Sequence, residues 1–266
     1  MISVIVPTYR EPDYLDICLM ALLEGQYNNN EIIVVVDGFV EENQWVIDKY
    51  KEQVLFLEFE ENRGIQTATN FGVYNSSNEK ILVINDDNVV SKDWDIILEE
   101  QFSEDVVTTV NQIEPTGPGM FNFPVKDFGQ SASEFRYKDF IEYESNVRED
   151  RNTLAGEILP FMLSKKNYMI VNGWDTLYDS PFICDWDFFL KLELIGLKFE
   201  RTYRLHFYHF GGKATKNRDD NIDENKFRIG EQEAYDVFEY KWGFRPQNGI
   251  NNTKKPNGII RGIDYE

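Results

Sequence analysis

The chain has 266 residues, of which 42% are hydrophobic and 15% aromatic, so it can build one sizeable core or at most two small ones. Its 47 Asp and Glu residues outnumber its 27 Lys and Arg residues, and the formal net charge of −20 argues against nucleic acid or an anionic membrane surface as the main partner. A nucleotide is not excluded, because a metal ion and a few basic side chains can neutralise one diphosphate locally.

The two cysteines, Cys18 and Cys184, lie far apart in apolar surroundings, which favours buried free thiols over a disulfide. A strand-like segment begins directly after Met1 and leaves no room for a signal peptide. No apolar run reaches the length needed to cross a membrane. We therefore expect a cytoplasmic protein without a transmembrane segment.

Short apolar runs alternate with helix-like segments in the first half of the chain. The runs predict buried strands over residues 2–6, 31–36, 54–59 and 80–84. Apolar residues at helical spacing predict a helix after Pro12, and further helices are expected over residues 45–50 and 65–74. Buried strands that alternate with helices predict an α/β fold with a mainly parallel central sheet and helices on both faces.

The second half is less regular, and prolines and glycines predict a long loop over residues 114–129. Strands are expected over residues 158–163, 168–171 and 204–210, and helices over residues 186–195 and 231–242. Without a repeat or an interdomain linker, the pattern predicts one domain over residues 1–245. A loosely structured tail rich in Asn, Gly, Lys and Pro is expected over residues 246–266.

Polar side chains follow the predicted strands, namely Thr8, Tyr9, Asp37, Asp86 and Asp87. Ligands of parallel sheets bind outside the carboxyl ends of the strands, so these residues are expected to converge on one crevice. A carboxylate pair there can hold a divalent cation, which would neutralise a diphosphate leaving group. Acidic doublets are frequent in this chain, so a solvated turn explains Asp86-Asp87 equally well when the pair is taken alone.

A series of short motifs adds context to that pair. In chain order they are Pro7-Thr8-Tyr9, Val36-Asp37-Gly38, Asn62-Arg63-Gly64, Asn70-Phe71-Gly72, Asn85-Asp86-Asp87, Asn172-Gly173-Trp174-Asp175, Cys184-Asp185-Trp186-Asp187, His209 and Lys241-Trp242-Gly243. Together they resemble the inverting glycosyltransferase family 2 over roughly residues 2–243. The resemblance implies the GT-A fold, with a nucleotide-binding half over residues 1–112 and an acceptor-binding half over residues 113–245.

The resemblance also implies that a sugar moves, with inversion, from a nucleoside-diphosphate sugar to a hydroxyl of a glycan or another acceptor. The residues implied to hold the nucleotide are Pro7, Thr8, Tyr9, Asp37, Asn62, Arg63, Gly64, Asn85 and Asp86. Asp37 would accept a hydrogen bond from N3–H of uracil or thymine, which favours UDP- or dTDP-sugars. A turn before Gly38 is the alternative for Asp37, and a plain turn is the alternative for Arg63.

The segment Asn85-Asp86-Asp87 matches the family's D-x-D site, with Asn85 in place of the first aspartate. Asn85 supplies no charge, so Asp87 is implied as the direct ligand of a Mn²⁺ or Mg²⁺ cofactor. His209 is implied to reach the same metal through a neutral imidazole. The alternative for His209 is a packed histidine, and His206 is the only other histidine in the chain.

Asp185 occupies the position of the family's catalytic base, which must face the acceptor hydroxyl and take its proton. Cys184 stands where the family usually has Glu. Capping of the following helix is the alternative for Asp185, and Asp187 could then serve as the base. Trp174, Asp175 and Asp187 are implied to border the acceptor and the transferred sugar.

Two other classes of protein compete with an active enzyme. A GT-A fold that only binds a nucleotide sugar or glycan is favoured by Asn85 and Cys184, and opposed by Asp87, Asp185 and His209 together. A sugar-nucleotide pyrophosphorylase would carry a Gly-rich loop with Arg after the first strand, which this chain lacks. The sequence leaves the sugar, the acceptor and the oligomeric state open.

Overall fold

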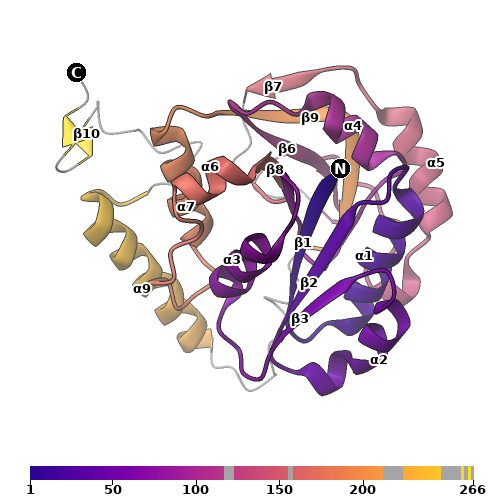
Figure 1. The fold of residues 1–266 in the computed structure, drawn as a ribbon, viewed down its shortest axis with the longest axis horizontal. Helices are drawn as coiled ribbons and strands as arrows, with labels where there is room; N and C mark the ends of the chain where they lie inside the picture. The colour runs from indigo at the N-terminus through magenta and orange to yellow at the C-terminus, as the bar shows by residue number, and fades with distance from the viewer. Residues whose placement is uncertain (117–122, 155–157, 212–223, 247–258, 261–262, 265–266) are drawn as a thin grey trace.

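Parallel strands form the first half of a central sheet (Figure 1). The computed structural model describes residues 1–116, 123–154, 158–211, 224–246, 259–260 and 263–264. The parallel strands are β1 (Ile2–Thr8), β2 (Glu31–Asp37), β3 (Leu55–Phe59) and β4 (Lys80–Val83), and their order in the sheet is β3-β2-β1-β4. The chain therefore changes direction across the sheet between β1 and β4, and open α/β sheets bind ligands at such a switch point.

The second half of the sheet is mixed. Its strands are β5 (Asn88–Val89), β6 (Val106–Ile113), β7 (Asn152–Leu154), β8 (Phe161–Ser164) and β9 (Lys198–His209). Strand β8 runs antiparallel to both β4 and β6, whereas β6 is parallel to β9. Both β5 and β7 pair antiparallel with β9, and the full order is β3-β2-β1-β4-β8-β6-β9-β5.

Helices cover both faces of the sheet (Figure 1). One face carries α1 (Pro12–Gly25), α2 (Val40–Tyr50), α4 (Trp94–Gln101) and α5 (Tyr137–Val147). The other face carries α3 (Ile65–Asn75), α6 (Lys165–Ile170), α7 (Cys184–Leu194) and α9 (Glu224–Trp242). The remaining described elements are a 3-10 turn (Ala132–Glu134) and the paired strands β10 (Ile259–Ile260) and β11 (Ile263–Asp264).

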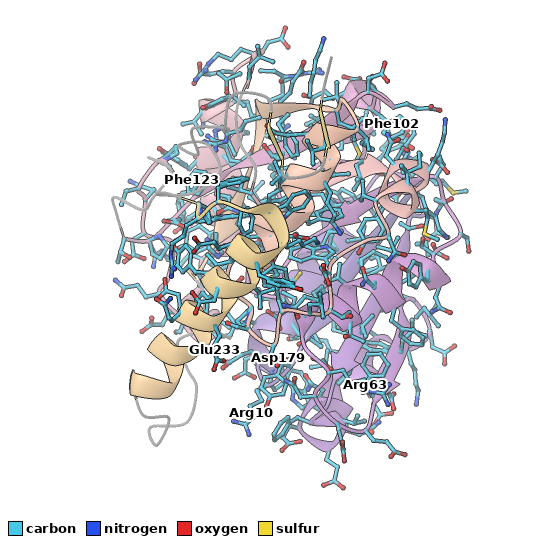
Figure 2. All side chains as sticks on the ribbon, turned by 90° about the vertical axis from the view of Figure 1, so that its left-hand side faces the viewer. Arg10, Arg63, Phe102, Phe123, Asp179 and Glu233 are labelled. Carbon is cyan, nitrogen blue, oxygen red and sulfur yellow. The ribbon has the colours of Figure 1, made fainter. Side chains whose placement is uncertain are left out.

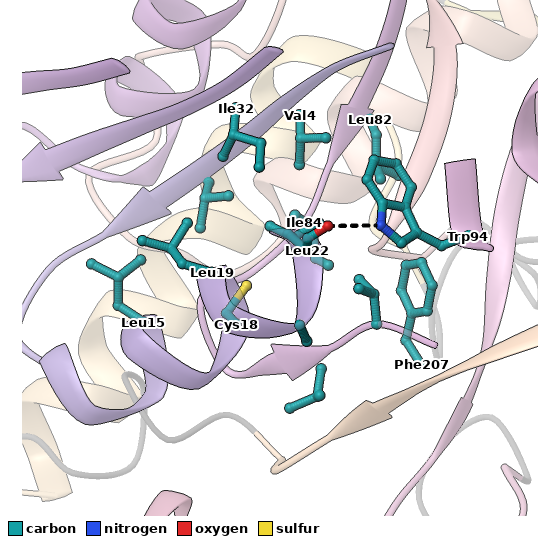
Figure 3. Close-up of a cluster of buried hydrophobic side chains, with 14 of the residues drawn as sticks. Val4, Leu15, Cys18, Leu19, Leu22, Ile32, Leu82, Ile84, Trp94 and Phe207 are labelled. Atoms are coloured by element: carbon teal, nitrogen blue, oxygen red, sulfur yellow. Dashed lines mark hydrogen bonds between the residues drawn. The ribbon is translucent and has the colours of Figure 1, made fainter. Parts of the chain in front are cut away.

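Two hydrophobic clusters, one on each face of the sheet, hold these layers together. Val4 and Val6 belong to one cluster and Ile5 to the other, because successive side chains of a strand point to opposite faces. Figure 3 shows part of the first cluster, in which Nε1 of Trp94 donates to the carbonyl oxygen of Leu22 over 3.2 Å. Both cysteines are buried free thiols, as their apolar surroundings predict.

One of the predicted strands is wrong, because residues 168–171 belong to α6 and the turn after it. Ser164 caps this helix by accepting a hydrogen bond from the Asn167 N–H, and a four-residue apolar run does not distinguish a strand from a helix. Two elements also begin earlier than predicted, β9 at Lys198 and α9 at Glu224.

Parts of the predicted loop and tail lie outside the described residues, namely 117–122 of the loop and most of 246–266. The boundary of a single domain at residue 245 stays a prediction. Across the part of the chain that the structure covers, no helix has both the length and the apolar character that crossing a membrane requires.

Candidate active site

A cavity of about 200 Å³ lies at the carboxyl ends of β1, β2 and β4. The residues predicted from the sequence that line it are Pro7, Thr8, Tyr9, Asp37, Asn62, Gly64, Asn85, Asp86 and Asp87. The predicted convergence of the polar residues that follow these strands is therefore confirmed. A wall of the cavity that the sequence did not reveal is residues 179–181, in the loop before α7.

Asp86 and Thr8 meet at the switch point between β1 and β4. The Thr8 hydroxyl donates to Oδ2 of Asp86 over 2.7 Å, and both side chains are buried. Burial and the adjacent charge of Asp87 raise the pKa of Asp86 to about 8. A cation bound beside the pair would favour the charged form of Asp86.

Asp37 shapes the loop that follows β3 as well as lining the cavity. Its Oδ1 accepts a hydrogen bond from the backbone N–H of Arg63 over 2.7 Å, and burial raises its pKa. The loop then enters α3 through Gly64, whose φ of 86° is readily adopted only by glycine. The turn interpretation of Asp37 and its place in the nucleotide cavity are thus compatible.

His209 lies between two carboxylates. Its Nε2 is 3.5 Å from Oδ2 of Asp87, and its Nδ1 is 2.9 Å from Oε1 of Glu114. The antiparallel pairing of Asn88 with His209 brings β5 and Asp87 to the end of β9. The parallel register of β6 and β9 pairs Ile113 with Tyr208, which leaves Glu114 beside the histidine.

Glu114 was missed by the sequence reasoning, because its position depends on the pairing of two strands far apart in the chain. A carboxylate beside Nδ1 can accept its proton, and a neutral imidazole held in this way would turn the lone pair of Nε2 toward Asp87. Within the described residues, no three His, Cys, Asp or Glu side chains form a metal cluster by themselves. That Asp87 and His209 bind a metal ion stays a prediction.

Asp185 lies in the first turn of α7, directly after the cavity wall of residues 179–181. Its Oδ1 accepts a hydrogen bond from the Trp186 N–H over 2.9 Å. Desolvation raises its pKa to about 6. The side chain does not itself line the cavity, but of the two aspartates in the first turn of α7 it is the one nearer in sequence to this wall.

Gln66 connects the two sides of the cavity and was also missed. It is buried in the first turn of α3, and its Nε2 donates to the carbonyl oxygen of Ser180 over 2.7 Å. Ser180 lies five residues before Asp185, so the amide of Gln66 anchors the loop that leads to the candidate base. No local pattern in the sequence indicates such a contact between distant loops.

The comparison with known protein families agrees with this geometry. The family model described as "Glycosyl transferase family 2" matches residues 3–168. The chain belongs to glycosyltransferase family 2. The predicted family is therefore confirmed, and the chain is a glycosyltransferase by that membership.

Curated relatives in bacteria support the same family. Glycosyltransferase GlyG of Streptococcus pneumoniae is 32% identical over 181 residues, which cover 62% of this chain and 57% of GlyG. Glycosyltransferase GlyA of the same species is 27% identical over 185 residues, covering 67% of this chain and 24% of GlyA. The poly-β-1,6-N-acetyl-D-glucosamine synthase of Staphylococcus aureus is 29% identical, covering 66% of this chain and 42% of the synthase. The chain therefore matches only a part of each of these longer relatives.

Solved structures show the fold. Staphylococcus aureus TarS has a TM-score of 0.60 at 15% identity, covering 96% of this chain and 46% of TarS. Its residues 1–349 have also been solved with UDP, with a TM-score of 0.59 at 14% identity, covering 91% of this chain and 72% of that structure. The predicted GT-A fold is confirmed by this likeness and by the family.

Membership of family 2 does not bring every predicted residue to the cavity. Trp174 is buried and stacks on Phe188, with ring centroids 5.3 Å apart. Asp187 is also fully buried, and its carboxylate binds Lys241 at 2.8 Å and accepts a hydrogen bond from Nε1 of Trp242 over 2.7 Å. Lys241 also contacts Asp175 at 2.5 Å.

Trp174, Asp175 and Asp187 do not line the nucleotide cavity, and their contact with the acceptor or the transferred sugar stays a prediction. The helical phase of α7 turns Asp187 toward the core, where it ties α7 to α9. Arg63 is likewise absent from the cavity lining, and its guanidinium lies 4.9 Å over the ring of Phe59. Of these four side chains, Trp174, Asp175 and Arg63 line a second cavity.

Proposed function

We propose that this domain transfers a sugar, with inversion, from a UDP- or dTDP-sugar to a hydroxyl of a glycan or another acceptor. The observation that carries the proposal is the cavity at the β1/β4 switch point, where the carboxylates at the ends of β2 and β4 meet Thr8 of β1. The UDP and UDP-GlcNAc complexes of the structural relative TarS support a uridine nucleotide as the donor.

The charge of the cavity supports a metal cofactor. Its described lining includes four carboxylates, Asp37, Asp86, Asp87 and Asp179, and neither Lys nor Arg. A diphosphate placed among these groups would be repelled unless a cation accompanied it. A bound Mn²⁺ or Mg²⁺ ion would supply that charge and stabilise the diphosphate as it leaves.

Asp87 and His209 fit such an ion. Their Oδ2 and Nε2 atoms are 3.5 Å apart, near the roughly 3 Å between adjacent ligands of an octahedral ion with bonds of about 2.1 Å. Glu114 holds the histidine in the tautomer that can bind a metal. Two protein ligands leave the other positions to phosphate oxygens and water, as is usual for Mg²⁺ at nucleotide sites.

Asp185 is proposed as the general base. Its pKa of about 6 lets the carboxylate be charged at neutral pH while remaining basic enough to accept a proton. Gln66 holds the preceding loop against the nucleotide cavity, so the acceptor hydroxyl would approach between that loop and the donor. A base on that side, opposite the diphosphate, implies a single displacement and inversion.

The second candidate is a binding module without turnover, which Asn85 and Cys184 favour. Both residues are neutral where the family pattern has an acid, and Cys184 is buried with its thiol donating to the carbonyl oxygen of Pro181. The intact set of Asp87, His209 and Asp185 favours the enzyme.

A panel of UDP-, dTDP- and GDP-sugars, each with Mn²⁺, Mg²⁺ or EDTA, decides between the two. Release of the nucleoside diphosphate that requires acceptor and metal, with an inverted product seen by NMR, supports the enzyme. Tight donor binding without any release supports the binding module, and a retained anomeric configuration overturns the proposed mechanism.

A further inference from the structure

A second cavity, of about 590 Å³, lies on the other side of α3 from the nucleotide cavity. Its size falls in the range of small-molecule sites. Gly64, Gln66 and Ala68 line the nucleotide cavity, whereas Arg63, Thr67, Asn70, Phe71 and Tyr74 line the second one. The latter residues recur at helical spacing, so two different faces of one helix bound two separate sites.

The charges of the two cavities are opposite. The second cavity is lined by Arg63, Lys191 and Lys241 and by a single carboxylate, that of Asp175. Three cations against one carboxylate leave a charge of +2, or +1 when the buried Asp187 behind Lys241 is included. The nucleotide cavity is lined by four acidic side chains and no cation, so it is negative even though a pKa of about 8 leaves Asp86 largely protonated at pH 7. In a chain of net charge −20, a positive cavity is an exception that would attract an anion.

Arg63 carries the surplus charge. Lys241 is paired with Asp175 and Asp187, and Lys191 lies 3.7 Å from Asp187 with a pKa that burial lowers. The side chain of Arg63 is exposed, and its guanidinium lies over the ring of Phe59. Among the residues that the structure describes, no carboxylate forms an ion pair with it. Figure 2 shows Arg63 at the lower end of the molecule in that view.

Aromatic rings form the apolar part of the same cavity. Phe59 and Phe71 pack with their centroids 5.0 Å apart, and Tyr74 is 45% exposed at the rim. The C–H faces of sugar rings are apolar and pack well on such rings. Side chains that can bind hydroxyl groups, those of Asn172 and Thr176, complete the lining.

We propose that the second cavity binds an anionic saccharide, that is, a sugar carrying a phosphate or a carboxylate group. The aromatic rings would hold the sugar ring, and the Arg63 guanidinium would bind the anion through two parallel hydrogen bonds. The site is separate from that of the donor, so its occupant binds together with the nucleotide. A negatively charged acceptor chain or an anionic effector would each present this chemistry.

Calorimetry on the full chain tests this proposal with four probes: glucose 6-phosphate, glucuronate, glucose and inorganic phosphate. All titrations are run with saturating UDP and Mg²⁺, so that the nucleotide cavity is filled. We expect at least one of the two anionic sugars to bind roughly tenfold more tightly than glucose and than phosphate, with an affinity that falls as salt rises. Binding of glucose 6-phosphate alone identifies a phosphate site, and binding of glucuronate alone identifies a carboxylate site.

Two variants and a control locate the binding. Arg63→Met removes the positive charge but keeps the backbone N–H that donates to Asp37. It should lower the affinity for the anionic sugar at least roughly tenfold. Tyr74→Ala should lower this affinity by a smaller factor. Lys51→Met is the control, because Lys51 is an exposed lysine that pairs with Asp48 on α2, and it should leave the affinity unchanged. The proposal is overturned if Arg63→Met binds the anionic sugar as the parent does, if phosphate binds as tightly as the sugar phosphate, or if no probe binds at millimolar concentration in the presence of UDP. None of these outcomes depends on sugar transfer, so they leave the proposed enzymatic function to its own test.

Discussion

Nε2 of His209 lies 3.5 Å from Oδ2 of Asp87, and a second carboxylate, that of Glu114, holds the other ring nitrogen at 2.9 Å. Three strand ends produce this arrangement, because β5 pairs with β9 and β9 runs beside β6. The order Glu114, His209, Asp87 resembles a carboxylate that orients a histidine toward a metal. The two proposed ligands and their orienting group can therefore be tested separately.

Asp87→Ala should abolish the metal-dependent part of UDP binding, because it removes the charged ligand. Glu114→Gln should weaken metal affinity about 10- to 100-fold without removing a ligand, since it loosens the orientation of His209. Calorimetry of UDP with and without Mn²⁺ measures both effects, and Glu52→Gln, at an exposed acid, is the matched control. Unchanged metal dependence in Asp87→Ala would exclude this residue as a ligand.

Asp37→Ala should weaken UDP binding by about 1–3 kcal/mol, the usual range for a lost charged hydrogen bond. The loss should be smaller for GDP, because guanine does not present the N3–H donor of uracil. Asp37 also accepts a hydrogen bond from the Arg63 N–H, so the melting temperature should fall as well. Equal losses for UDP and GDP would mean that Asp37 acts only through the loop.

Local sequence patterns predicted the nucleotide cavity well. The apolar runs of β1, β2 and β4 are buried on both faces, which identified them as strands. The polar residue at the end of each run had to lie at the carboxyl edge of the sheet. Thr8, Asp37 and Asp86 therefore meet as expected. The strands of the mixed second half of the sheet were harder to predict, because antiparallel strands such as β8 do not alternate regularly with helices along the chain.

Contacts between distant segments could not be predicted in this way. Glu114 depends on the register of β6 against β9, and Gln66 depends on the approach of one loop to another. Asp185 and Asp187 lie two residues apart on α7, and only the packing of α9 shows which of them is buried as an ion pair. A motif match alone treats both aspartates as candidates for the same role.

Asp187→Asn should lower the free energy of unfolding by about 3 kcal/mol or more, because it leaves Lys241 with less compensating charge in a buried site. UDP affinity should stay within about twofold of the parent's, since Asp187 does not line the nucleotide cavity. Urea unfolding and calorimetry measure the two quantities. Asp236→Asn, at an exposed carboxylate of α9 that pairs with Arg245, should change stability by less than about 1 kcal/mol. If the Asp187→Asn protein is as stable as the parent but no longer binds UDP, Asp187 acts in the active site and not in the core.

Asp185→Asn should leave UDP binding unchanged and slow transfer at least ~10²-fold, because the amide cannot accept the acceptor's proton. In the parent, the transfer rate should rise with pH and level off above about 6, where the carboxylate becomes charged. In the Asp185→Asn variant, the transfer rate should no longer rise with pH near 6, and any pH dependence caused by other groups should remain.

The raised pKa of Asp185 also predicts that its replacement by Asn stabilises the protein at neutral and higher pH, whereas replacement of Asp187 by Asn destabilises it. A folded-state pKa of about 6 lies above the ordinary value of about 3.9, so between these values the native state binds more protons than the unfolded state. The contribution of Asp185 to stability is therefore full below about pH 4 and is lost as the pH rises through about 6. Asp185→Asn should consequently melt at a higher temperature than the parent at pH 8, and the difference should shrink toward pH 4. An Asn variant that is both less stable at pH 8 and fully active would identify Asp185 as a residue of the helix terminus, and Asp187 would then be the remaining carboxylate of α7 to examine as the base.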